Sequence, residues 1–386
     1  MNHGPSVDEY PRLPGPARFI QDVAADLSEG RSAVLVFPDA AVTSGLADVI
    51  LDDLSREGYR AEFCAESSEA FPTRVLTTFG ADLTAQRHFE AWETVISWEA
   101  WHGSWVFVPG WRHKDVAEIV DRWPAQLNAC GLAIEDRPKL VIAVRLSDLP
   151  RKKITHLDPG RTVVHWWWGV LDRLDSETRL AAVARRHHLT PVDASVITEV
   201  AGWDLACIDH LAESWDRSTT ALAAVLTDYQ DSGIASTVRS AETSAIGRGK
   251  SMPPAALEQA WSDGRVERWG HSIRWAPHTL DVAEVERRVW LAHNRTLIPY
   301  VDEERARYER MIRPKATPQA LAGLDFRDDD IIEIGSLKWL VESGHVDIGR
   351  EDKRRLRAFG ILRNNLAHRR PVPDALLQEI VGYLDF

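Results

Sequence analysis

Residues 32–38 read SAVLVFP, a short apolar run between Gly30 and a closing proline. A run of this length between turn residues predicts a strand that is buried on both faces. Four further stretches have the character of strands: YRAEFCAE (59–66), SWVFVPGW (104–111), PKLVIAVRLSDLP (138–150) and RTVVHWWWGVLDRL (161–174). Helical patterns separate them at 18–29, 47–58, about 82–101 and 115–130. Apolar strands that alternate with helices predict a parallel, three-layer α/β sheet.

The turn after the 32–38 strand is where such a sheet would hold a nucleotide, because ligands bind at the carboxyl ends of parallel strands. A P-loop needs GxxxxGK[ST] there: its amides and lysine hold the phosphates, and its hydroxyl binds Mg²⁺. Residues 38–45 instead read PDAAVTSG, a polar loop with no lysine, in which Asp39 would repel a phosphate. The strand at 104–111 ends in Pro-Gly and lacks the acidic residue that would hold the metal. We therefore expect no ATP hydrolysis, no bound cofactor and no metal.

Two other patterns imitate ligand sites. GRGKS at 247–251 contains the Gly-Lys-Ser of a P-loop, but no apolar strand precedes it. Prolines at 253 and 254 follow it, where the helix of a phosphate loop would have to continue. His187 and His188 are adjacent, and neighbouring residues on a helix diverge too far to share one ion. We interpret the first pattern as a flexible linker and the second as a pair without a metal.

The order of the strands, the helical stretch 176–215 after them and its GWDL turn resemble the STAND and AAA-type P-loop NTPases in an inactivated form. The resemblance covers roughly residues 14–230. It implies a degenerate P-loop NTPase-like α/β domain over 1–175 and a helical lid-like region over 176–245. The sequence departs from that family at the residues that bind and hydrolyse ATP, so the resemblance does not imply ATPase activity.

Residues 246–280 are expected to form a linker with a remnant of a winged helix. A helical pattern there is followed by RVERWGHSIRWAP (265–277), which alternates as a hairpin. The hairpin is not notably basic, which gives the winged-helix assignment little support.

Residues 281–386 show helical patterns only, and their short connections predict an all-α bundle of four antiparallel helices. The expected helices are 281–312 with a kink at Pro299, 331–344, 351–368 and 373–384. The third helix has an apolar stripe of Leu356, Phe359, Leu362 and Leu366. It ends in RNNLAH, where Asn364 and His368 are neighbours at i,i+4 and Arg363 stands beside them.

RNNLAH resembles the R-x4–6-H signature of HEPN domains, as does its place late in a small helical bundle. Some HEPN domains are metal-independent ribonucleases, and others are non-catalytic dimerisation or RNA-binding modules. In a catalytic HEPN site, His368 would transfer a proton at the ribose 2′-OH or the leaving oxygen. Arg363 would stabilise the charge on the scissile phosphate, and Asn364 would orient the histidine or the phosphate. The resemblance also implies a site completed across a twofold dimer.

A structural role for the same residues stays open, because Asn and His at a helix end can satisfy the last carbonyls. Basic residues surround the motif: Arg350, Lys353, Arg354, Arg355, Arg357, Arg369 and Arg370. They could attract RNA phosphates or an acidic partner, or they could form a solvated face.

The composition places the chain among globular proteins, with 386 residues and a formal charge of −12. That charge argues against a protein that coats nucleic acid over its whole surface. Cys64, Cys130 and Cys207 lie far apart without a CxxC pair, which predicts free thiols in a reducing cytoplasm. Most of the 16 tryptophans are expected in the core. We find no signal peptide and no run of membrane-spanning length.

Three functions are considered. The resemblance to inactivated STAND and AAA-type NTPases together with HEPN domains implies the first, a non-hydrolysing regulatory or interaction component of a bacterial intracellular defence or conflict system, with other proteins as partners and a homodimer through the C-terminal bundle. The alternative is a metal-independent HEPN-type endoribonuclease. A third is a regulator that binds a nucleotide without hydrolysing it.

Overall fold

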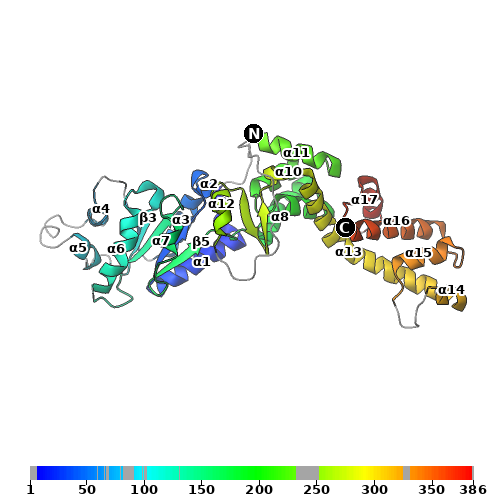
Figure 1. The fold of residues 1–386 in the computed structure, drawn as a ribbon, viewed down its shortest axis with the longest axis horizontal. Helices are drawn as coiled ribbons and strands as arrows, with labels where there is room; N and C mark the ends of the chain where they lie inside the picture. Colours follow the sequence, from blue (N-terminus) through cyan, green and yellow to red (C-terminus); the bar gives the residue numbers. More distant parts are fainter. Residues whose placement is uncertain are drawn as a thin grey trace. The chain divides into compact units, whose positions relative to one another are not determined.

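The computed structural model describes residues 7–58, 60–64, 66, 69–78, 80, 91–97, 99, 102–129, 131–231, 252–324 and 331–384. The chain divides into two compact units (Figure 1). The sheet unit comprises the described parts of residues 1–178 and 241–276, and the helical unit those of residues 179–240 and 277–386. GRGKS at 247–251 and Cys130 lie outside the described residues.

The sheet unit is built on five parallel strands in the order β2-β3-β4-β1-β5. They are β1 (Ser32–Val36), β2 (Ala61–Phe63), β3 (Trp105–Pro109), β4 (Lys139–Val144) and β5 (Thr162–Trp166). Val34 of β1 stands opposite Ile142 of β4 on one side and Val164 of β5 on the other. Every residue of β1, β3 and β4 is buried, as expected for the interior of a parallel sheet. The predicted parallel α/β sheet is confirmed.

The helices of the sheet unit differ from prediction in two places. They are η1 (Val7–Arg12), α1 (Pro14–Ser28), α2 (Asp39–Thr43), α3 (Leu46–Glu57), α4 (Phe71–Thr78), α5 (Ala91–Ser97), η4 (Gly110–Arg112), α6 (Val116–Ala129) and α7 (Arg151–Ile154). The segment expected as a polar loop forms α2, because Pro38 has the backbone of a residue that precedes a first helical turn. α4 was not predicted, and of the helix expected at about 82–101 the described part is α5.

The hairpin predicted after the linker is confirmed and packs on the sheet unit. It consists of β6 (Val266–Trp269) and β7 (Ser272–Trp275), preceded by η5 (Ala255–Leu257) and α12 (Glu258–Ser262). Trp261 of α12 lies with its ring centroid 5.8 Å from that of Trp166 and 6.4 Å from that of Trp168. These rings, with Trp92, Trp105 and Trp167, are buried, as predicted for the core. The segment 252–276 therefore belongs to the sheet unit.

One carboxyl group ties the hairpin to the end of β5. Glu267 is buried and accepts hydrogen bonds from the backbone N–H of Gly169 at 2.7 Å and of Arg268 at 2.9 Å. The indole N–H of Trp261 donates to its other oxygen at 3.2 Å. Burial raises the pKa of Glu267 to about 8, against the effect of these three donors.

The helical unit continues from the latter part of α8 (Arg173–His187). It contains α9 (Pro191–Ala201), α10 (Leu205–Ser214), α11 (Thr219–Asp231), η6 (Pro277–Thr279), α13 (Val282–Ile312), η7 (Arg313–Lys315), α14 (Pro318–Ala322), α15 (Ile334–Glu342), α16 (Arg350–Ala367) and α17 (Asp374–Val381). α13 runs as one helix through Pro299 and packs on α9, α15 and α16. No helix of the described residues is long and apolar enough to cross a membrane.

The boundaries of the two units differ from the four segments predicted from the sequence. The lid-like helices and the C-terminal helices share one unit, and Val192 of α9 belongs to the same core cluster as Leu297, Phe359 and Leu366. Cys64 and Cys207 are free and buried, as predicted.

Candidate functional site

The carboxyl ends of β1 and β4 lie side by side inside the sheet, where α/β proteins usually form a ligand crevice. Here they are joined by polar groups of the chain itself. Asp39, directly after β1, accepts a hydrogen bond from the hydroxyl of Ser262 in α12 at 2.8 Å. Arg145, directly after β4, lies with its Nε 3.5 Å from Asp39 and makes two hydrogen bonds to Asp148, at 2.9 and 2.7 Å. Arg145 is thus shared between two carboxylates, and Oδ1 of Asp39 has no hydrogen-bond partner among the described residues.

α12 lies beside α2 at this edge (Figure 1). Arg151 of α7 donates to the carbonyl of Pro253 before α12 at 2.9 Å and forms an ion pair with Glu258, the first residue of α12. Residues 253–264 thus contact α7 through Arg151 and α2 through Asp39.

The close approach of this segment to α2 depends on Gly264. A Cβ at this position would lie 2.8 Å from the Cβ of Ala40, and the backbone has φ +71°. We expect Gly264→Ala to lower the free energy of unfolding by about 3 kcal/mol, from strain and from overpacking. Gly270→Ala is the matched control, since its φ is +62° and nothing lies near its Cβ; it should cost about 1 kcal/mol. Urea unfolding followed by tryptophan fluorescence measures both, and equal losses would contradict the close contact.

The predicted motif lies at the end of α16. The stripe of Leu356, Phe359, Leu362 and Leu366 is buried, as predicted. Arg363, Asn364 and His368 are all exposed, and His368 is the C-cap residue of α16. The guanidinium of Arg363 is 3.6 Å from the carboxylate of Glu333.

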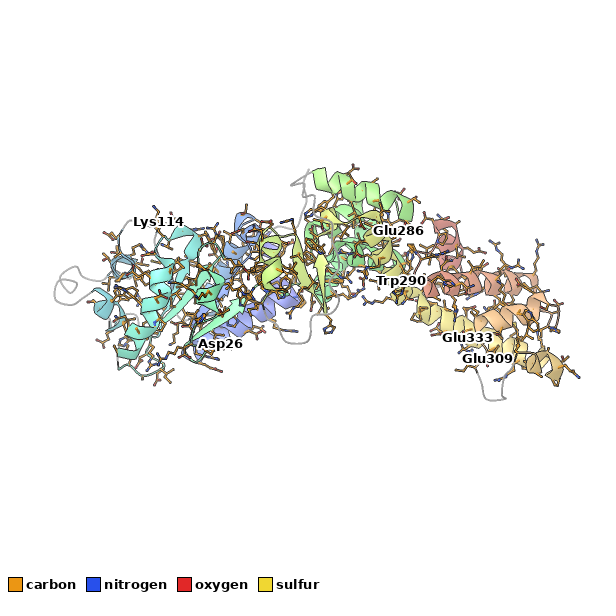
Figure 2. The ribbon with its side chains drawn as sticks, in the orientation of Figure 1. Asp26, Lys114, Glu286, Trp290, Glu309 and Glu333 are labelled. Atoms are coloured by element: carbon orange, nitrogen blue, oxygen red, sulfur yellow. The ribbon has the colours of Figure 1, made fainter. Side chains whose placement is uncertain are left out.

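The carbonyls of Asn364, Asn365 and Leu366 at the end of α16 are satisfied without the side chains of Asn364 and His368. The indole N–H of Trp290, a residue labelled in Figure 2, donates to Leu366 O at 2.8 Å. The backbone N–H groups of His368 and Arg370 donate to Asn364 O and Asn365 O, each at 3.0 Å. Within the described chain, no hydrogen bond engages the side chain of Asn364 or His368. These two side chains therefore do not cap the helix in this structure, in contrast to the structural role considered above.

Most of the basic residues of α16 are paired with carboxylates. The closest ion-pair distances are 2.6 Å for Lys353 with Asp347, Arg354 with Glu379 and Arg355 with Glu304, and 3.0 Å for Arg357 with Glu342. Arg369 lies over the ring of Trp290, 5.9 Å from its centroid, while Arg350 and Arg370 are exposed. These pairs reduce the positive charge that the helix offers to RNA.

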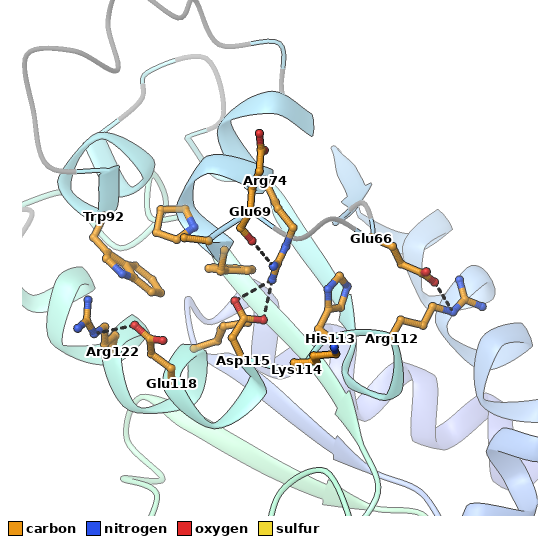
Figure 3. A pocket seen from close by; sticks show the side chains of 14 residues that line it. Glu66, Glu69, Arg74, Trp92, Arg112, His113, Lys114, Asp115, Glu118 and Arg122 are labelled. Carbon is orange, nitrogen blue, oxygen red and sulfur yellow. Dashed lines mark hydrogen bonds and ion pairs between the residues drawn. The ribbon is translucent and has the colours of Figure 1, made fainter.

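A site that the sequence analysis missed lies at the carboxyl ends of β2 and β3, and we call it the β2–β3 cleft (Figure 3). It has a volume of about 880 Å³, within the range of ligand pockets. Its lining residues are Glu66, Glu69, Ala70, Phe71, Pro72, Arg74, Trp92, Arg112, His113, Lys114, Asp115, Glu118, Ile119 and Arg122. The run Arg112–Asp115 directly after a buried strand is the signal by which it could have been found.

The floor of the cleft is a buried ion pair. Arg74 of α4 is 4% exposed and donates two hydrogen bonds to Asp115, at 2.7 and 3.0 Å, and one to Glu69 O at 2.6 Å. Next to it, burial raises the pKa of the Cys64 thiol, so this cysteine is not an activated nucleophile. The geometry of the cleft thus suits binding rather than covalent chemistry.

His113 completes the floor of the cleft. It is 8% exposed, and burial, followed by the charge of Arg74, lowers the pKa of its imidazole, so the ring is neutral near pH 7. It makes a hydrogen bond to the backbone of Cys64, while its Nε2 has no partner in the described chain. No group of three or more His, Cys, Asp or Glu among the described residues is placed to hold a metal ion. Comparisons with protein-family models, curated protein sequences and solved structures found no match to this chain.

Proposed function

We propose that this protein is a non-hydrolysing regulatory or interaction component of a bacterial intracellular defence or conflict system. The proposal keeps the resemblance to inactivated STAND and AAA-type P-loop NTPases and to HEPN bundles. It places the protein in the cytoplasm, with other protein components as partners and a homodimer through the C-terminal helices.

The observation that supports it most is the polar network of Asp39, Ser262, Arg145 and Asp148 at the β1 turn. A triphosphate at this turn would have to displace Asp39 from Arg145 and lie against a carboxylate. That exchange costs both the existing pair and the repulsion between like charges. A sheet without a working phosphate site is best explained as a scaffold for contacts with other molecules.

An RNA-cleaving effector remains the second candidate, and one observation favours it: the exposed side chains of Asn364 and His368 are engaged by no other described residue, and Arg363 stands beside them. His368 would then act in proton transfer, Arg363 on the phosphate and Asn364 in orientation. Against it stand the ion pairs that neutralise most of the neighbouring basic residues.

Incubation of the purified chain with total RNA in EDTA separates the two candidates. An interaction protein should leave the RNA intact, and the wild type should match His368→Ala. If the chain cleaves RNA and His368→Ala lowers the rate by about 100-fold or more, the second candidate replaces the first. His345→Ala is the matched control, because this histidine lies against Trp339 in the same unit and outside the motif.

A further inference from the structure

β5 is an edge strand of the sheet, and its outer side pairs with no other strand among the described residues. It pairs with β1 alone, and the hairpin of β6 and β7 forms a separate sheet. The edge of a sheet presents backbone N–H and C=O groups with which a further extended chain can pair. The outer side of β5 is therefore a candidate surface for the addition of a strand.

The hydrogen bonds between β5 and β1 show which residues of β5 point outward. The backbone N–H of Trp167, directly after β5, donates to Val36 O at 2.9 Å, so Trp167 faces β1. Because successive residues of a parallel strand turn alternately toward and away from the neighbouring strand, Val164 and Trp166 direct their backbone groups outward. No described residue forms a hydrogen bond with these groups. Two backbone donors and two acceptors are thus left for a partner.

A groove with a volume of about 300 Å³ lies at this open edge. Val164, His165 and Trp166 line it from β5, and Phe19 lines it from α1, which packs beside β5 (Figure 1). The ring centroid of His165 is 6.0 Å from that of Phe19, so His165 points to the face that α1 covers, and Val164 and Trp166 point to the opposite face. Because β1 occupies the inner side of β5, a space that reaches both α1 and these two residues lies at the outer edge of the strand.

The walls of the groove favour a single extended segment over a second folded copy of this chain. Arg18 and Asp22 of α1 and Leu174 of α8 also line the groove, so the open edge is one wall of a hollow and not a protruding rim. Paired strands lie about 4.8 Å apart. Two copies with recessed edges would meet at these walls before their backbones reached that distance, whereas an extended segment can enter. Leu174 is 53% exposed and offers an apolar contact to a side chain of that segment.

We propose that the open edge of β5 binds an extended segment of a partner protein, which adds a sixth strand to the sheet. The N–H and C=O groups of the segment pair with those of Val164 and Trp166, and one of its apolar side chains packs on Leu174. The inference rests on the proposed role as an interaction component, and it names the surface and the mode by which the partner binds.

Phage display of random linear peptides of about seven residues, selected against the full chain, supplies probes with the length of a strand. Synthetic peptides from the selection should bind the full chain in fluorescence polarisation with a Kd below about 100 μM. N-methylation of such a peptide at one residue after another tests the mode of binding. Methyl groups on the amides that face β5 should weaken binding at least about tenfold, and those on the alternate amides should leave it unchanged, because only every second amide of an added strand bonds to the edge.

A proline substitution on each edge of the sheet locates the binding. Val164→Pro removes an outward N–H without breaking the ladder to β1, and it should weaken binding of the same peptides at least about tenfold. Ala61→Pro is the matched control on β2, the other edge strand. Ala61 also faces away from its neighbour, because the N–H of Cys64 donates to Phe107 O of β3 at 2.8 Å. This variant should bind the peptides as the wild type does.

A selection without binders would overturn the inference, and so would peptides that tolerate N-methylation at every position. Binding of equal strength to Val164→Pro and the wild type would place the contact on another surface, which refutes the inference but leaves the interaction role intact. Cleavage of RNA through His368 would instead remove the proposed function, whatever the peptides do at β5. If Val164→Pro fails to fold, the pattern of N-methylation on the wild type decides alone.

Discussion

The sheet unit should lose stability as the pH rises from about 5 to about 8, by about 3.5 kcal/mol through Glu267 alone, out of about 5 kcal/mol over the whole titration of this group. The pKa of this carboxyl is about 8 in the folded chain and 4.5 in the unfolded reference. Between these values the folded state binds one proton more than the unfolded state, so stability falls as the pH rises. Each unit of difference corresponds to about 1.4 kcal/mol, and the contribution is complete below about pH 4.5.

Urea unfolding at several pH values between about 5 and 8 measures this effect. Tryptophan fluorescence is a suitable probe, because Trp166, Trp168 and Trp261 are clustered beside Glu267. Glu267→Gln does not titrate and should show a flatter dependence on pH than the wild type. Parallel curves for the two proteins would mean that Glu267 ionises normally in the fold.

The helical unit should respond in the opposite direction, through His293. This side chain is 1% exposed on α13, and its Nδ1 accepts a hydrogen bond from the backbone N–H of Val372 at 3.0 Å. Burial lowers its pKa to about 4 from 6.5, with a smaller opposing effect of Asp374. Between these values the unfolded chain binds the extra proton, so stability is complete above about pH 6.5 and falls by about 3 kcal/mol as the pH drops to about 4.

Amide hydrogen exchange measures the stability of this unit separately from that of the sheet unit. The peptides to follow come from α13 and α16, and their rates are corrected for intrinsic exchange. His293→Asn can keep an acceptor for Val372 and does not titrate, so its protection should change less between about pH 7 and pH 4. Loss of protection of equal size in wild type and variant would exclude His293 as the cause.

The strands were predictable because each is a short apolar run between turn residues, and burial on both faces of a parallel sheet leaves that pattern in the chain. α2 was not, because Asp39–Thr43 has no apolar stripe; it is fixed by Pro38 before it and by Ser262 from a distant segment. The packing of the hairpin on the sheet unit was also not predictable from the sequence, because it depends on contacts of Trp261 with Trp166 and Trp168. Contacts of this kind are tertiary and have no local signature.

The candidate sites show the same limit. The sequence predicted that a candidate site lies at the end of α16. It did not show that the basic residues of this helix are paired, because their carboxylate partners come from other helices, such as Glu304 of α13 and Glu379 of α17. The β2–β3 cleft joins Arg74, Trp92 and His113 from three segments, and no single stretch of sequence shows that they meet. In both cases the sequence shows which charged and polar residues are present, but it does not show which residues they contact in the folded chain.

Calorimetric titration of the full chain with ATP and Mg²⁺ tests most directly whether the β1 turn is closed to nucleotides. We expect no saturable heat up to about 5 mM ATP, and no change on Arg145→Ala, because Arg145 is already matched by Asp39 and Asp148. Saturable binding that Arg145→Ala abolishes would show that the turn accepts a triphosphate, and it would contradict the central claim.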